Sequence, residues 1–97
     1  MASGNIKRLT NSNPLGYIGP LVNEVTAAYL DVLAEQLDPK PLVSYGTTAK
    51  NFTNVEQHTR FLRTIQPDGL QAAAIALFIQ QQGWQKVAVL YTNDAYG

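Results

Sequence analysis

Cysteine is absent from this 97-residue chain, so neither a disulfide framework nor a thiolate metal site is available to it. Seven basic and seven acidic residues balance to a net charge of zero, and the basic residues are scattered. Nucleic-acid binding requires a clustered basic face, so we predict no nucleic-acid partner. The longest apolar stretches, such as Val87 to Tyr91, are far shorter than the ~20 residues that a membrane span requires.

Residues that carry catalysis are equally scarce. The only histidine, His58, lies in a polar segment, and no two acidic residues have a spacing suited to paired acid–base chemistry. Gly16-x-x-Gly19 lacks both the dinucleotide fingerprint and the Walker lysine, which a dehydrogenase-like nucleotide enzyme would need. We therefore predict that the chain is not an enzyme and has no catalytic residue, cofactor or metal ligand.

Apolar periodicity predicts an α/β fold. Short apolar runs predict strands, and apolar residues at the helical period predict helices. Asn23 is placed to cap the first helix, and Gly83 has the position at which a left-handed residue ends the second. The predicted strands are 15–19, 41–45, 61–65 and 86–91, and the predicted helices are 24–37 and 69–82. This alternation indicates parallel βαβ units with right-handed crossovers.

Ligands of parallel α/β folds bind beyond the carboxyl ends of the strands. Gly46, Thr47 and Thr48 form one such turn, where exposed backbone N–H groups and hydroxyls could hold a carboxylate. Asn23 lies at a helix N-terminus that favours an anion. Asp68 can pair with an ammonium group, and Tyr96 can cover that cation with its ring. The alternatives are that Asp68 only caps its helix, that Thr48 only satisfies its turn, and that Tyr96 belongs to the core.

Five segments occur in one order that resembles a known family. These are Gly16-Tyr-Ile-Gly-Pro20, Pro41-Leu-Val-Ser-Tyr-Gly-Thr-Thr-Ala49, Arg60-Phe-Leu-Arg-Thr64, Gly83-Trp-Gln-Lys-Val-Ala-Val-Leu-Tyr91 and Asn93-Asp-Ala-Tyr-Gly97. The succession resembles the receptor branch of the type I periplasmic-binding-protein fold, often called the atrial natriuretic factor receptor ligand-binding region. That branch includes ectodomains of class C G-protein-coupled receptors, and bacterial amino-acid binding proteins are its soluble relatives.

The resemblance implies a two-lobed clamshell of which this chain is a central fragment. Residues 1–14 are expected to be an irregular segment, residues 15–66 part of the first lobe, and residues 67–97 the hinge and the start of the second lobe. In amino-acid-binding members, the turn matching Gly46 to Thr48 grips the ligand, an acidic residue stands at Asp68, and an aromatic stands at Tyr96. Those members usually carry serines where this chain has Leu21-Val-Asn-Glu24.

The implied function is binding of a small, amino-acid-like ligand between two lobes, with lobe closure as the signal. The resemblance places this region on the extracellular side of the plasma membrane, with any membrane attachment in segments outside this chain, and family members often dimerise. The alternative is a periplasmic solute-binding component of an amino-acid ABC uptake system. Asn51-Phe-Thr53 is an N-glycosylation triplet, which fits a secreted eukaryotic chain.

Overall fold

The computed structural model describes residues 2–94. Its elements are, in order, α1 (Ala2–Thr10), β1 (Tyr17–Ile18), α2 (Asn23–Ala34), β2 (Leu42–Ser44), the 3₁₀ helix η1 (Lys50–Thr53), β3 (Phe61–Arg63) and α3 (Asp68–Gln81). From β1 to α3 the strands and α-helices follow the predicted order, and the bounds of α2 and α3 differ from the predicted ones by three residues or fewer.

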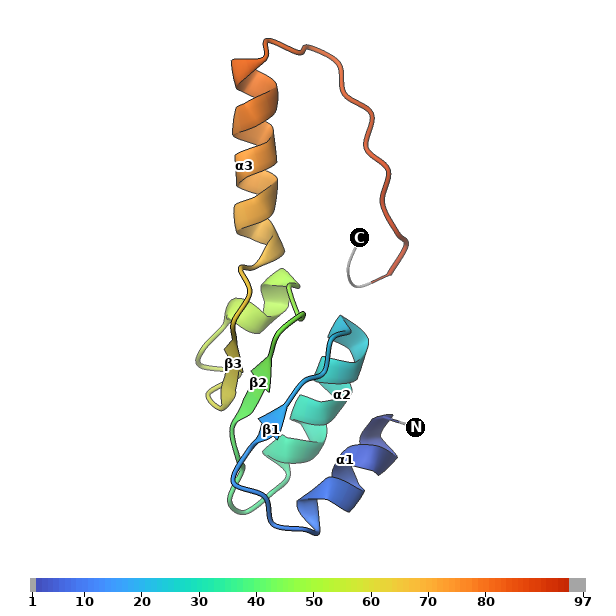
Figure 1. Cartoon of the computed structure of the whole chain (residues 1–97), viewed down its shortest axis with the longest axis vertical. Helices are drawn as coiled ribbons and strands as arrows, with labels where there is room; N and C mark the ends of the chain where they lie inside the picture. Colours follow the sequence, from blue (N-terminus) through green and yellow to red (C-terminus); the bar gives the residue numbers. More distant parts are fainter. Residues whose placement is uncertain (1, 95–97) are drawn as a thin grey trace.

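The three strands form one parallel sheet in the order β1-β2-β3. Tyr17 pairs with Leu42, which pairs in turn with Phe61, and all three side chains are buried on the same face. Helix α2 covers that face, and α1 packs against α2 (Figure 1). The parallel pairing confirms the predicted fold class, an α/β piece consistent with part of a lobe of the type I periplasmic-binding-protein fold.

The N-terminal segment is a helix over Ala2–Thr10, so the prediction that residues 1–14 are irregular is wrong for most of that range. Ile6 is fully buried in the core cluster and fixes α1 against α2. Lys7 and Arg8 lie in the last turn, where positive charge is favourable to the helix dipole. Among residues 3–10 only Ile6 is buried, and one buried side chain is too weak a periodic signal for a sequence reading to detect.

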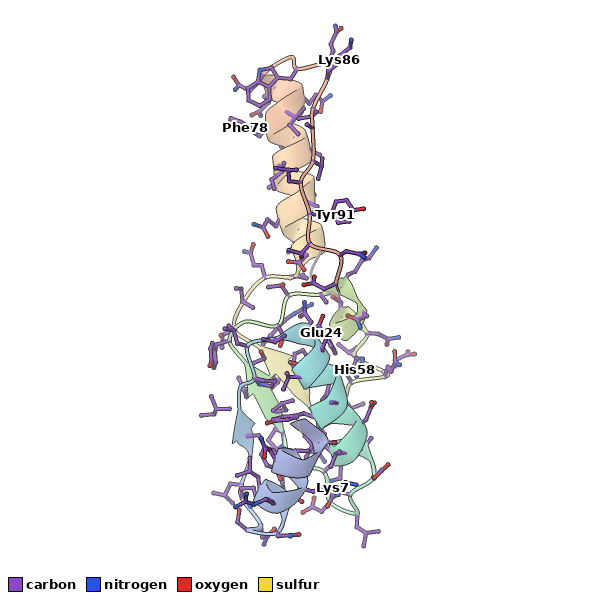
Figure 2. All side chains as sticks on the ribbon, turned by 90° about the vertical axis from the view of Figure 1, so that its right-hand side faces the viewer. Lys7, Glu24, His58, Phe78, Lys86 and Tyr91 are labelled. Carbon is purple, nitrogen blue, oxygen red and sulfur yellow. The ribbon has the colours of Figure 1, made fainter. Side chains whose placement is uncertain are left out.

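Helix α3 stands apart from this core. None of its residues is buried, and Leu70, Ile75, Leu77 and Phe78 are each more than half exposed (Figure 2). The radius of gyration is 16.6 Å, against the ~13 Å typical of a compact domain of this size. The molecule is therefore elongated (Figure 1). Helix α3 extends away from the edge of the sheet at which the strands end, called here the strand-end edge (Figure 1).

Residues 86–91 were predicted to be a strand, and this is wrong for the described chain: the segment runs back along α3 without strand pairing (Figure 1). A strand needs a neighbour to receive its backbone hydrogen bonds, and β1, β2 and β3 pair only with one another. Gly83 does end the helical segment with a left-handed φ of 70°, as predicted.

Candidate functional site

A chain of hydroxyl groups joins β2 to the start of α2 at the strand-end edge. Ser44 Oγ lies 2.6 Å from Pro20 O and 2.7 Å from Thr47 Oγ1, which lies 2.6 Å from Thr26 Oγ1, and Thr26 donates to Val22 O at 3.0 Å. A carbonyl oxygen can only accept, so Ser44 donates its hydroxyl proton to Pro20 O and Thr26 donates its proton to Val22 O. Thr47 then donates its own proton to either Ser44 or Thr26. Thr47 is fully buried, and its hydroxyl serves the fold.

Asn23 has a different role from the predicted helix cap. Helix α2 begins at Asn23, its N-cap is Val22, and no side chain makes a capping bond there. Instead, the buried Asn23 side chain reaches the turn after β2, where its Oδ1 accepts the backbone N–H of Thr48 at 3.1 Å and of Ala49 at 3.2 Å. The residue locks the N-terminus of α2 to the turn that follows β2.

The turn of Gly46, Thr47 and Thr48 is predicted to hold a ligand carboxylate with exposed backbone N–H groups, but in the structure all three N–H groups donate within the chain. Gly46 and Thr47 donate to Ser44 Oγ at 3.3 and 3.0 Å, while Thr48 and Ala49 donate to Asn23 Oδ1. Buried N–H groups are normally paired, and a side chain from each neighbouring element supplies the acceptor here. A ligand would therefore have to use side chains of the turn.

Thr48 offers one such side chain. The residue is 8% exposed, and its Oγ1 is buried with no hydrogen-bond partner among residues 2–94. A buried hydroxyl without a partner costs about 1–3 kcal/mol, so it usually has an external partner or function. Among the predicted residues of the turn, Thr48 is the one whose side chain has an unused polar group.

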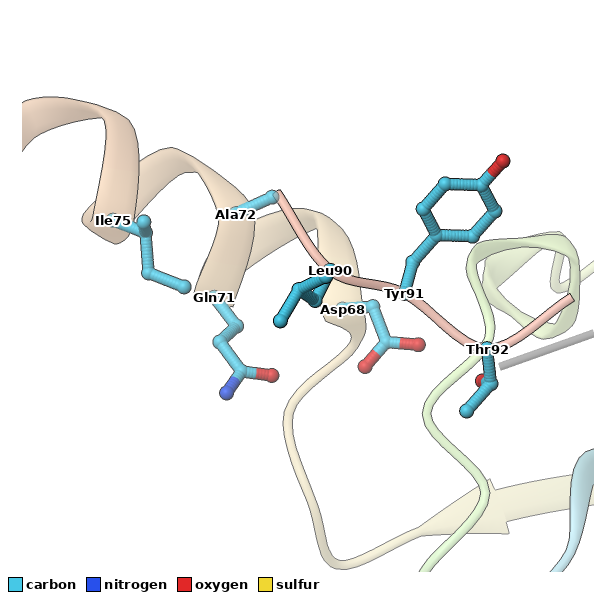
Figure 3. Close-up of a pocket in the computed structure, with 7 residues that line it drawn as sticks. All are labelled: Asp68, Gln71, Ala72, Ile75, Leu90, Tyr91 and Thr92. Atoms are coloured by element: carbon cyan, nitrogen blue, oxygen red, sulfur yellow. The ribbon is translucent and has the colours of Figure 1, made fainter. Parts of the chain in front are cut away.

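Asp68 is tied directly to Thr48. It is the first residue of α3, and its backbone N–H donates to Thr48 O at 2.9 Å. Its carboxylate makes no capping bond, and within residues 2–94 it has no hydrogen-bonded or ion-paired partner. This side chain lines a hollow of about 540 Å³ between α3 and residues 90–92, which run back along the helix (Figure 3). The hollow is lined by Asp68, Gln71, Ala72, Ile75, Leu90, Tyr91 and Thr92.

Gly46 is pressed against the segment that precedes α2. A Cβ placed on Gly46 would stand 2.1 Å from Leu21 Cδ1 and 3.1 Å from Leu21 O. The glycine therefore makes room for Leu21, whose side chain is 58% exposed at the same edge as Thr48. This edge presents an apolar side chain where the resemblance led us to expect serine.

Two predicted residues, Tyr96 and Asn51, remain. Tyr96 lies outside the described residues. Asn51 is exposed on η1. Sequence reading missed Arg63, whose Nη1 donates to Thr47 O at 3.4 Å and to Ala49 O at 3.1 Å, holding the turn from the side of β3. A lone arginine at the end of a predicted strand was the available signal.

The comparisons with known proteins agree with this architecture. A family model described as "Receptor family ligand binding region" matches residues 6–97. The chain belongs to this family. Ligand binding, not catalysis, defines the family, and this confirms that the chain is not an enzyme.

Several receptors are similar to parts of the chain. "Taste receptor type 1 member 3" from Canis lupus familiaris is 39% identical over 57 residues, covering 59% of this chain and 7% of the receptor. "G-protein coupled receptor family C group 6 member A" from Homo sapiens is 36% identical over 80 residues, 82% of this chain and 8% of the receptor. "Glutamate receptor 3.1" from Oryza sativa subsp. japonica is 34% identical over 80 residues, again 82% and 8%.

The chain thus spans less than a tenth of the length of each of these receptors. Between residues 2 and 94, no helix is both long enough and apolar enough to cross a membrane.

Proposed function

We propose that this segment forms part of an interlobe cleft that binds a small, amino-acid-like ligand. The observation that carries the proposal is the buried Thr48 hydroxyl without a partner. The backbone carbonyl of Thr48 also accepts the N–H of Asp68, which holds the two residues next to each other. A hydroxyl can donate to a carboxylate, and a free aspartate can pair with an ammonium group. The two groups together complement the two charges of a zwitterion.

The proposed mechanism is closure of two lobes around the ligand. Residues 65–67 link the sheet to α3 between two anchoring bonds, Thr64 N to Ser44 O at 3.0 Å and Asp68 N to Thr48 O at 2.9 Å. Such a short link can act as one strand of a hinge. We infer that residues 15–66 belong to the first lobe and that residues from 67 onward begin the second.

We further propose that the region lies on the extracellular side of the plasma membrane and that closure is passed to a signalling partner. The names of the matched relatives denote receptors, which supports this proposal over a periplasmic uptake component. These relatives do not identify a specific ligand for this chain, because Leu21 changes the side chains at the edge where the strands end.

The test is a thermal-shift screen of the full-length protein against single amino acids, nucleotides and sugars. A ligand that binds only the native state at 100 times its Kd stabilises it by ~2.7 kcal/mol. We expect stabilisation by an amino acid, and an affinity loss of about 1.5–3 kcal/mol in Asp68→Asn, the cost of one charged hydrogen bond.

Asp31→Asn is the matched control, because Asp31 is an exposed carboxylate on α2 away from the strand ends. It should leave the affinity unchanged. Stabilisation by nucleotides alone, or equal affinity in wild type and Asp68→Asn, would contradict the proposal.

A further inference from the structure

We propose that Asn51, on the 3₁₀ helix η1, is an N-linked glycosylation site. Asn51-Phe-Thr53 is the one Asn-x-Ser/Thr triplet in the 97 residues. The inference rests on the extracellular placement proposed above and is independent of the ligand. It assigns a covalent modification to a segment that the binding proposal does not use.

The folded geometry can accommodate a glycan on Asn51. Its side chain is exposed on η1, and it has no hydrogen-bonded partner among the described residues. The neighbouring Phe52 points the other way: it is 5% exposed, with its ring centroid 5.5 Å from those of Phe61 and His58. A bulky sugar on Asn51 would therefore extend into solvent without displacing any contact of the core.

The third residue of the triplet, Thr53, is also exposed in the folded chain. The hydroxyl of the third residue is part of what defines the acceptor triplet. In the folded chain, Thr53 Oγ1 accepts a hydrogen bond from Arg63 Nη2 at 2.6 Å, and Phe52 is buried. Arg63 also holds the carbonyl of Ala49 just before η1, at 3.1 Å. Thr53 only accepts the bond from Arg63, so its hydroxyl proton remains available to a second partner.

The reaction is a balanced group transfer. The side-chain nitrogen of Asn51 attacks C1 of the first sugar of a lipid-diphosphate-linked oligosaccharide. The N–C1 bond forms, the C1–O bond to the diphosphate breaks, and the lipid diphosphate leaves with the electron pair. The amide nitrogen gives up one proton to a base, and no oxidant or reductant takes part.

The experiment translates the full 97-residue chain behind a cleavable secretion signal in the presence of microsomes. Acceptance on a nascent chain does not require the product to fold, so the result does not depend on stability. We expect one slower-migrating species that peptide N-glycosidase removes. Asn51→Gln should abolish it, and Asn54→Gln should retain it, since Glu56 stands where a hydroxyl would be needed.

Two further variants test the hydroxyl of the triplet. Thr53→Ser keeps the triplet and should remain glycosylated. Thr53→Ala removes the hydroxyl that defines the triplet and should abolish the slower-migrating species. Absence of the slower species from the wild-type chain, or its persistence in Asn51→Gln, would overturn the site assignment. Modification of Thr53→Ala would overturn it as well.

Discussion

The side-chain oxygen of Asn23 and the backbone nitrogen of Thr48 are 3.1 Å apart, although 25 residues separate them in the chain. The bond holds the first turn of α2 against the turn that follows β2. It also occupies the N–H group that a ligand carboxylate would otherwise use. Asn23 therefore shapes the candidate site by removing backbone donors from it, leaving the Thr48 hydroxyl as the available group.

Asn23→Ala should lower the free energy of unfolding by about 1–3 kcal/mol, because it leaves two backbone N–H groups without their acceptor in a buried turn. Asn54 provides the matched control. Its Oδ1 also accepts two backbone N–H groups, of Glu56 and Gln57, but at an exposed position where water replaces the lost bonds. Urea unfolding should show a much smaller loss for Asn54→Ala. Equal losses would mean that burial of the Asn23 bonds is unimportant.

Gly46→Ala should destabilise the protein by about 1–3 kcal/mol, since the new methyl group would stand 2.1 Å from Leu21 Cδ1. Removing the Leu21 side chain relieves most of this overlap. In a double-mutant cycle, the cost of Gly46→Ala should fall by at least half in the Leu21→Ala background. Additive costs would show that Leu21 does not limit the space at Gly46.

Gly83→Ala should shorten α3, because a φ of 70° at this position costs an L-residue about 1–2 kcal/mol. Gly69→Ala is the control within the same helix: its Cβ would meet no atom within 4 Å, and it should add about 1 kcal/mol of helix stability. Circular dichroism reports helix content. The fluorescence of Trp84, whose ring packs edge-on against Phe78 at 5.9 Å, reports the helix end. A gain of helix in both variants would contradict the left-handed cap.

Tyr17 should make stability fall in alkaline solution. Burial raises the pKa of its phenol above the ordinary 10.0, against a smaller lowering by Lys40. Its contribution is therefore complete below pH 10.0 and is lost as the pH rises through the folded-state pKa, because the unfolded chain ionises first. Tyr17→Phe should flatten this part of the stability–pH curve. An unchanged alkaline slope in Tyr17→Phe would assign the effect to other groups.

Much of the fold followed from the sequence, because α2, α3 and the three short strands have clear apolar patterns and parallel pairing follows from their alternation. The errors share a physical cause: each depends on a tertiary contact. Ile6 makes α1 a helix by packing on α2, and residues 86–91 lack a strand beside them. The apolar pattern of a segment indicates which secondary structure the segment favours. It does not show whether a neighbouring helix or strand is present to pack or pair with it.

The candidate site was predictable only in outline. Composition identified Thr47 and Thr48 together, but it could not show that Ser44 and Thr26 engage the first and leave the second free. The distinction depends on a difference in side-chain direction between adjacent residues of a turn. Asp68 was predicted at the start of its helix, while its link to Thr48 appears only in three dimensions.

The assignment of the ligand contact to Thr48 is tested most directly by measuring ligand affinity in Thr48→Val beside Thr47→Val. Both changes replace a hydroxyl with a methyl group. Thr47→Val breaks the contacts with Ser44 and Thr26, so it should lower the free energy of unfolding by about 1–3 kcal/mol and leave the affinity of the folded protein unchanged.

In Thr48→Val, the lost hydroxyl had no partner, so stability should be unchanged or slightly higher. Calorimetric titration of the full-length protein with the amino acid found in the ligand screen should then show an affinity at least about tenfold weaker, the equivalent of one hydrogen bond to a charged group. Unchanged affinity in Thr48→Val would contradict the assignment of this hydroxyl to the ligand.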